Sequence, residues 1–204
     1  MPSQLKALMI LNGLGAILFL SIHAMCILGF GWRIAGVELF VLLPIVSLIA
    51  SAYGLAMFLS PRESRIPGAK IAAGAALMGV LWFPIIRGAF ELRRYGFEQA
   101  TVRAETLIVA IERYVREHGS APESIDLLVP EYLPAIPDRL PPIGIISGKD
   151  VRDDFGGNHW VLHASVATGF INFDSFMYFP NGDYPDEGYG GWIERIRGWA
   201  YVHE

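Results

Sequence analysis

Two carboxylate-rich loops near the C-terminus hold the residues with the clearest capacity for chemistry. Each combines one asparagine with three acidic residues: Asp150, Asp153, Asp154 and Asn158 in the first, and Asn181, Asp183, Asp186 and Glu187 in the second. Hard cations such as Ca²⁺ take several oxygen ligands, which loops of this composition can supply. Neither loop has the regular D-x-D-x-D-G spacing of a calcium-binding loop. We therefore favour solvated turns and keep a Ca²⁺ site as the alternative.

The histidines do not indicate a metal centre. His159 and His163 are four residues apart in a predicted strand, so their positions are separated by ~13 Å at ~3.3 Å per residue. One ion cannot bridge that distance, and ordinary sheet histidines are the better interpretation. No nucleophile elbow, phosphate-binding loop or H-E-x-x-H motif is present. We predict that the chain is not an enzyme and that it has no cofactor other than the Ca²⁺ considered above.

The composition is that of a membrane protein. Of 204 residues, 53% are hydrophobic and only 18% are charged, which is too apolar for an ordinary soluble chain. The single cysteine, Cys26, excludes an intrachain disulfide and a thiolate metal site. Residues 97–204 carry eight Lys and Arg against seventeen Asp and Glu. Phosphate binding needs clustered basic residues, so nucleic acid is excluded as a partner.

Three apolar runs are long enough to cross a bilayer: 5–30, 34–59 and the run that begins at Ala69. A polar, basic loop over 60–68 separates the second from the third. The third run continues without a turn signal into an amphipathic segment that ends at Gly119. Read as one helix, 69–119 would be about 75 Å long. Small residues over 50–54 and 72–79 predict close helix packing in lipid.

The amphipathic segment has one apolar face to bury. Eight residues share that face at the helical period: Phe97, Ala100, Ala104, Leu107, Ile108, Ile111, Tyr114 and Val115. A proline-rich connector over 121–142, with a short helical piece at 123–129, and a loop over 143–158 are expected next. Three strands are then predicted over 159–166, 170–179 and 191–201. We expect these strands to form a small antiparallel sheet that covers the helix face.

The predicted fold class is therefore an α+β membrane protein with three transmembrane helices. Residues 1–68 form a two-span hairpin and the basic loop, and 69–118 form the third transmembrane helix and its amphipathic continuation. Residues 119–204 form a β domain that packs on 97–118. The lipid bilayer is the first partner that this organisation implies.

The segment 107–137, LIVAIERYVREHGSAPESIDLLVPEYLPAIP, resembles the region of type IV pilins and type II secretion pseudopilins where the long helix ends. The matching positions are Tyr114, Gly119, Pro122, Leu127, Leu128, Tyr132, Leu133, Pro134, Ile136 and Pro137. Pro84 stands about where those proteins carry a helix proline. The likeness covers roughly 70–204 and implies a pilin-like domain. Pseudopilins often bind calcium in a terminal loop, which would favour Asp183, Asp186 and Glu187 over the first cluster.

The chain departs from these families at the prepilin leader. Gly68 matches the glycine at the cleavage point, but the following Phe and the early Glu are absent, and two extra spans precede the helix. The resemblance therefore implies a permanently anchored domain. It also implies a non-enzymatic structural or interaction protein linked to secretion or surface assembly, with a protein partner or self-association through the C-terminal domain. The alternative function is an ion or ligand sensor that uses the acidic loops.

The charge distribution leaves the orientation open. Three spans place four basic residues on each side: Lys6, Arg62, Arg65 and Lys70 on one, and Arg33, Arg87, Arg93 and Arg94 on the other. The positive-inside rule does not decide between them. The resemblance implies a bacterial cytoplasmic (inner) membrane, with the N-terminus in the cytoplasm and the C-terminal domain outside it.

Overall fold

The computed structural model describes residues 2–33, 39–40, 42–60, 64–148, 155–167, 173–182, 184 and 192–203. The chain divides into two compact units. Unit 1 comprises Met1–Ala24 and Gly36–Leu92, and unit 2 comprises Met25–Ala35 and Arg93–Glu204. One helix, α3 (Arg65–His118), contributes its first part to unit 1 and its second part to unit 2.

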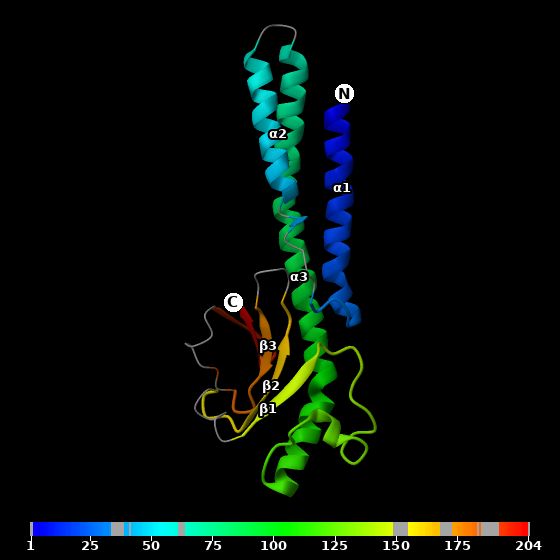
Figure 1. The fold of residues 1–204 in the computed structure, drawn as a ribbon, viewed down its shortest axis with the longest axis vertical. Coiled ribbons are helices and arrows are strands. Elements are labelled where there is room, and N and C mark those ends of the chain that lie inside the picture. The colour runs from blue at the N-terminus through cyan, green and yellow to red at the C-terminus, as the bar shows by residue number, and fades with distance from the viewer. Residues whose placement is uncertain are drawn as a thin grey trace. The chain divides into compact units, whose positions relative to one another are not determined.

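Unit 1 is a group of apolar helices (Figure 1). They are α1 (Ser3–Ala24), α2 (Leu42–Leu59) and the first part of α3. Among the described residues, three helices are long and apolar enough to cross a membrane, as predicted. Helix α3 begins at Arg65, four residues before the predicted start. Pro67 falls in its first turn, where a missing N–H costs no helical hydrogen bond.

Small residues bring α2 and α3 into close contact. A Cβ atom at Gly54 would collide with the backbone of Ala72, and one at Gly68 would collide with the backbone of Phe58. The Ser51 hydroxyl donates a hydrogen bond to the Ala72 carbonyl at 3.0 Å. The prediction that small residues let these helices approach is therefore confirmed.

A buried asparagine joins all three helices of unit 1. The Asn12 side-chain oxygen accepts hydrogen bonds from the Ser47 hydroxyl at 3.2 Å and from the Trp82 indole at 2.6 Å. The Asn12 amide donates to the Leu8 carbonyl at 2.9 Å. All three of these polar side chains are buried. In an apolar setting such a cluster is stable because each polar group has a partner.

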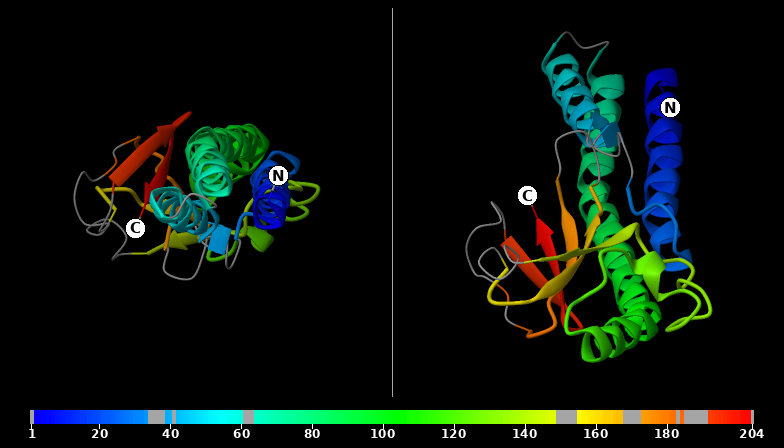
Figure 2. Two further views of the ribbon diagram at one scale, coloured as in Figure 1. Left: turned by 90° about the horizontal axis from the view of Figure 1, so that it is seen from above. Right: turned by 60° about the horizontal axis from the view of Figure 1, so that its bottom comes forward.

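Unit 2 is an antiparallel sheet packed on the second part of α3 (Figure 2). Its described strands are β1 (Ile143–Ser147), β2 (Trp160–Ser165), β3 (Ser175–Tyr178), β4 (Trp192–Ile196) and β5 (Trp199–His203). They pair in the order β1-β2-β3-β5-β4. This is the α+β layout that the sequence predicts. The short helical piece in the connector is a 3-10 helix, Ile125–Leu128.

The sheet has two strands more than the three predicted. The predicted loop over 143–158 was wrong at its start, because 143–147 pairs with β2 along its whole length. The single strand predicted over 191–201 was also wrong. It is two strands joined by a two-residue turn, in which Arg197 and Gly198 have φ of 48° and 85°. Two positive φ values give the turn that suits the twist of paired strands.

The predicted apolar face of α3 is the core of unit 2. Ala104, Leu107 and Ile111 are fully buried, and Val115 is partly buried. They pack with Phe176 and with other sheet residues, including Leu162, Ala164, Trp199 and Tyr201. The charged residues on the opposite face are exposed. The helical period in the sequence thus identified the buried face correctly.

Candidate functional site

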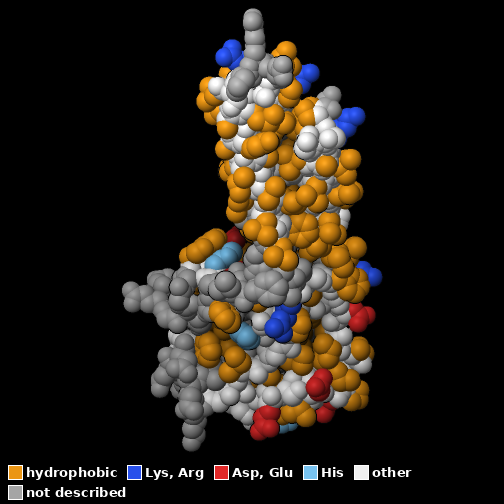
Figure 3. All heavy atoms as spheres, turned by 45° about the horizontal axis from the view of Figure 1, so that its top comes forward, with side chains coloured by type: hydrophobic (Ala, Val, Ile, Leu, Met, Phe, Trp, Pro, Cys, Tyr) orange, Lys and Arg blue, Asp and Glu red, His pale blue; other side chains and the backbone are white. Residues whose placement is uncertain are grey.

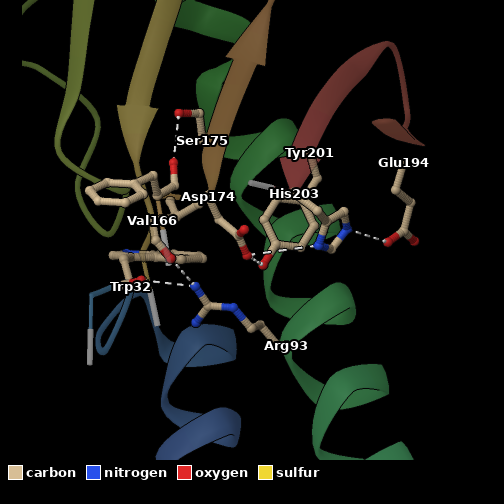
Figure 4. A network of polar contacts seen from close by, with 9 residues as sticks. Trp32, Arg93, Val166, Asp174, Ser175, Glu194, Tyr201 and His203 are labelled. Carbon is tan, nitrogen blue, oxygen red and sulfur yellow. Dashed lines mark hydrogen bonds and ion pairs between the residues drawn. The ribbon is translucent and has the colours of Figure 1, made fainter. Parts of the chain in front are cut away.

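A buried polar network connects α3 with one end of the sheet in unit 2 (Figure 4). Its centre is Arg93, which is only 2% exposed. One guanidinium nitrogen donates to the carbonyls of Trp32 at 2.9 Å and Val166 at 2.6 Å. The other contacts the Cys26 sulfur at 3.3 Å, and the guanidinium lies 5.1 Å from the centre of the Phe97 ring. Arg93 therefore ties three separate chain segments together.

The local sequence explains how Arg93 reaches these partners. Arg93 and Phe97 are four residues apart on α3, so their side chains share one face. Gly96 lies beside them, and a Cβ atom there would collide with Cys26. The missing side chain lets the 3-10 turn Met25–Leu28 approach the helix closely. The turn then brings its carbonyls to the arginine.

A second set of polar side chains lies on the sheet next to Arg93. The buried Asp174 accepts a hydrogen bond from the Tyr201 hydroxyl at 2.6 Å. His203 lies between two carboxylates, 3.8 Å from Asp174 and 3.6 Å from Glu194, both longer than a hydrogen bond. Glu194 also forms an ion pair with Arg94 of α3 at 3.0 Å. The network thus links α3 to β3, β4 and β5.

Burial is the largest cause of the pKa shifts of Tyr201 and His203 in this network. It raises the pKa of Tyr201, an effect that Arg93 opposes and Asp174 reinforces. It lowers the pKa of His203 from 6.5, and this outweighs the opposite effect of Asp174 and Glu194. His203 is therefore neutral in the folded protein at pH 7. The arrangement holds chain segments in place, and it contains no activated nucleophile.

A cleft of about 700 Å³ lies at the opposite end of the sheet, where α3 ends. Its walls mix polar and apolar groups and include Gly119, Glu123, Ser147, His159, Trp160 and Asn181. The Ser147 hydroxyl donates to the Pro122 carbonyl and the Asn181 amide donates to the Gly157 carbonyl, each at 3.5 Å. We assign no reaction or ligand to this cleft.

The six acidic residues predicted as metal ligands lie outside the described residues: Asp150, Asp153, Asp154, Asp183, Asp186 and Glu187. Within the described part of the chain, no group of three or more His, Cys, Asp or Glu side chains could hold a metal ion. The asparagines of the two predicted loops are described. The Asn158 side chain is fully buried and accepts a hydrogen bond from the Asn181 backbone at 2.9 Å. This bond joins the two loop regions.

Three further ionisable residues are His163 on β2, His23 within α1 and Glu38 near the start of the second apolar run. His163 contacts the Ser175 hydroxyl at 3.1 Å across the β2–β3 pair. His23 is buried, with its ring nitrogen 2.8 Å from the Phe19 carbonyl. Glu38 lies outside the described residues.

The sequence analysis did not identify the Arg93–Asp174 region as a site. Arg93 was counted as an interfacial charge, although its position four residues before Phe97 places it on the buried face. The sequence gives a weaker indication that Asp174 is buried: it is an isolated carboxylate in a run that is rich in aromatic residues. The contacts of both depend on segments far apart in the chain, which no local pattern reports.

Comparison with protein-family models, with curated proteins and with solved structures finds no match to this chain. The functional proposal therefore rests on the fold and on the geometry of named residues.

Proposed function

We propose that the chain is a membrane-anchored, non-enzymatic interaction protein that holds a pilin-like α+β domain outside the cytoplasm of a bacterial cell. One observation carries the anchoring part of this proposal. The surface of unit 1 is apolar and the contacts inside it include polar groups, which is the reverse of a water-soluble helical bundle.

Many of the exposed side chains of unit 1 are large and apolar. Ile10 and Ile17 of α1 are 63% and 65% exposed, and Leu59 and Phe83 are 73% exposed. The buried residues of α2 are Ser47 and Gly54. Hydrophobic side chains cover the visible face of these helices (Figure 3). A continuous apolar surface of this kind is unfavourable in water and favourable in lipid.

The interaction role is supported by how the domain is attached. Helix α3 is continuous from the apolar run to the buried face of unit 2. Arg93 fixes the sheet to the helix at the point where α3 enters unit 2. A long helix covered by a small antiparallel sheet is also the layout implied by the pilin-like segment 107–137. We infer that the domain presents its surface to a partner or to another copy of the chain.

Protease treatment of spheroplasts that carry the chain with an N-terminal tag tests the proposal. The chain should resist extraction by alkaline carbonate, because lipid-facing helices leave the membrane only with detergent. Added protease should degrade 97–204 and leave the tag intact. Release by carbonate would contradict anchoring. Protection of the domain in intact spheroplasts would contradict its export.

An ion-sensing role is the second candidate, and the Asn158–Asn181 contact is the observation that favours it. The contact joins the last residue of the first acidic loop, Asn158, to the first residue of the second, Asn181. If Ca²⁺ binds there, adding it to chelator-treated protein should raise the melting temperature. The matched variant Asp183→Asn with Asp186→Asn should lose that increase. An unchanged melting temperature in the native chain would remove this candidate.

A further inference from the structure

The exposed aromatic residues of unit 2 gather at one end of the unit. In the described part of unit 2, the aromatic side chains classed as exposed are Phe30, Tyr95, Phe173 and Trp192. Phe173 and Trp192 are 68% and 61% exposed. The exposed aliphatic side chains Met25 and Leu28 lie in the same N-terminal segment as Phe30, whereas Val109, Leu127 and Ile146 lie farther from Arg93. The exposed aromatic residues therefore share this end of the unit with two exposed aliphatic ones.

Contacts and sequence neighbours place these four residues at the end of unit 2 where Arg93 lies. Trp192 pairs with His203 in the β4–β5 register and stacks on its ring at 3.7 Å. Phe173 directly precedes Asp174, which contacts both Tyr201 and His203. Tyr95 is two residues beyond Arg93 on α3.

The fourth residue reaches the same end through the N-terminal segment of the unit. Phe30 is two residues before Trp32, whose carbonyl accepts a hydrogen bond from Arg93. Arg93 is the residue at which α3 enters unit 2. All four aromatic residues thus belong to the end of the unit where the helix enters it.

We propose that Phe173 and Trp192, supported by Phe30 and Tyr95, insert into the headgroup region of the bilayer and form a second lipid contact of the domain besides α3. This inference rests on the proposed membrane anchoring. The apolar run 71–90 ends three residues before Arg93 on the same helix. At ~1.5 Å per residue, the membrane interface is then about one turn of helix from Arg93.

The chemistry of the surface favours lipid as its occupant. Tryptophan and tyrosine concentrate at membrane–water interfaces, because an apolar ring and a polar group suit that depth. Trp192 and Tyr95 have this character. Arg94 forms its ion pair with Glu194 on the strand that begins at Trp192, so a polar, charge-paired group borders the exposed aromatic ring, as suits the interfacial depth.

The functional consequence is a fixed orientation of the domain. A direct contact of the domain with the bilayer restrains the tilt of the domain relative to the membrane plane. The cleft at the other end of the sheet would then point away from the membrane.

Environment-sensitive fluorophores on single introduced cysteines test this surface in the full chain. The variants are Phe173→Cys, Trp192→Cys, Val80→Cys on the apolar part of α3, and Leu127→Cys on the exposed 3-10 helix. Cys26 is fully buried, and the native chain measures its background labelling. Each labelled chain is reconstituted in phosphatidylcholine–phosphatidylglycerol vesicles and exposed to aqueous iodide or to headgroup-region spin-labelled lipid.

Labels at positions 173 and 192 should emit at shorter wavelength than the label at 127 and be quenched by the spin-labelled lipid. The label at 127 should be quenched by iodide alone. If the labels at positions 173 and 192 are quenched by iodide alone, as at position 127, the proposed lipid contact is wrong. If the label at position 80 is still not quenched by iodide, the membrane anchoring is nevertheless supported. Protection of 173 and 192 from both quenchers would indicate a protein contact and would also overturn the inference. Iodide quenching at position 80 would overturn the anchoring itself.

Discussion

The two units of this chain bury opposite kinds of side chain. In unit 1, the apolar residues Ile10 and Ile17 point outward, while Asn12 and Ser47 are buried and bonded to each other. In unit 2, apolar residues such as Leu107 fill the core, and the charged residues on the far face of α3 are exposed. The same helix takes part in both patterns.

This difference indicates what holds each unit together. Burial of apolar area stabilises unit 2, as in any water-soluble domain. In lipid, where the proposed function places unit 1, that force is absent between helices, so unit 1 would depend on close approach at glycines and on buried hydrogen bonds. The two units should therefore respond differently to the same kind of mutation.

The largest effect is expected for truncation in the core of unit 2. Leu107→Ala should cost ~2–5 kcal/mol of folding free energy, because it leaves a cavity among fully buried residues. Ile111→Ala should cost a similar amount. Thermal or denaturant unfolding of the full chain in detergent measures both. Val109→Ala on the exposed side of the same helix is the matched control and should change little. Equal stability of the Leu107 and Val109 variants would refute the packing described for unit 2.

A somewhat smaller loss is expected at the charged link between α3 and the sheet. Arg93→Leu removes donors to two buried carbonyls, and loss of a charged hydrogen bond costs ~1.5–3 kcal/mol. The neighbouring exposed Arg94→Leu should cost much less. Trp32 and Val166 accept the bonds that are lost, so proteolysis near these residues should become faster. Unchanged stability and proteolysis for Arg93→Leu would show that the network is not structural.

In unit 1 the polar substitution should matter more than the apolar one. Asn12→Leu makes α1 more hydrophobic but removes the acceptor for Ser47 and Trp82. Hydrogen bonds between membrane helices contribute ~0.6–1.7 kcal/mol, so a loss in that range is expected. Ile10→Ala on the outer surface is the control. If Ile10→Ala proves the more damaging in detergent or lipid, the hydrogen bonds of Asn12 do not stabilise unit 1 and the comparison fails.

The smallest effect is a dependence of stability on pH through His203. Burial lowers the pKa of His203 from 6.5 in the folded state, so the unfolded chain binds its proton more readily. The stability of the fold should therefore be full above the unfolded pKa. It should fall as the pH drops below about 6.5 towards the lower folded value. Asp174, Glu194, Arg93 and Arg94 are the charged groups around this histidine.

Comparison of the native chain with the His203→Asn variant measures the contribution of His203 to the pH dependence of stability. Melting temperatures at about pH 7.5 and about pH 5 should differ more for the native chain than for the variant. Equal differences would mean that His203 does not change its proton affinity on folding.

The sequence predicted those parts of the fold that local patterns report. The face of α3 that carries Leu107 and Ile111 follows from the helical period, and the three long apolar helices follow from composition. Strand β1 was missed because Ile143–Ser147 is short, contains Gly144 and follows two prolines. Its pairing with β2 overrides those local signals. The dipeptide Arg197-Gly198 has the glycine that is typical of a two-residue hairpin turn. It was overlooked because a single strand was predicted over 191–201.

The buried network could not be predicted in the same way. Arg93 bonds to Trp32 and Val166, which lie 61 and 73 residues away in sequence. The spacing of Arg93 to Phe97 places its side chain on the buried face of α3, but no local pattern reports which carbonyls it contacts. The three-dimensional contacts identify these carbonyls and also reveal the hydrogen bond from Tyr201 to Asp174.

Labelling of single cysteines in intact cells tests the central claim most directly. The variants are Val80→Cys, Val109→Cys and Ser60→Cys, and a membrane-impermeant maleimide is added before or after permeabilisation. The two-unit account predicts that position 109 is labelled in intact cells and position 60 only after permeabilisation. Position 80 should resist labelling in both conditions, because its side chain faces lipid although it is exposed on the protein surface. Labelling at position 80, or at position 109 only after permeabilisation, would contradict the account.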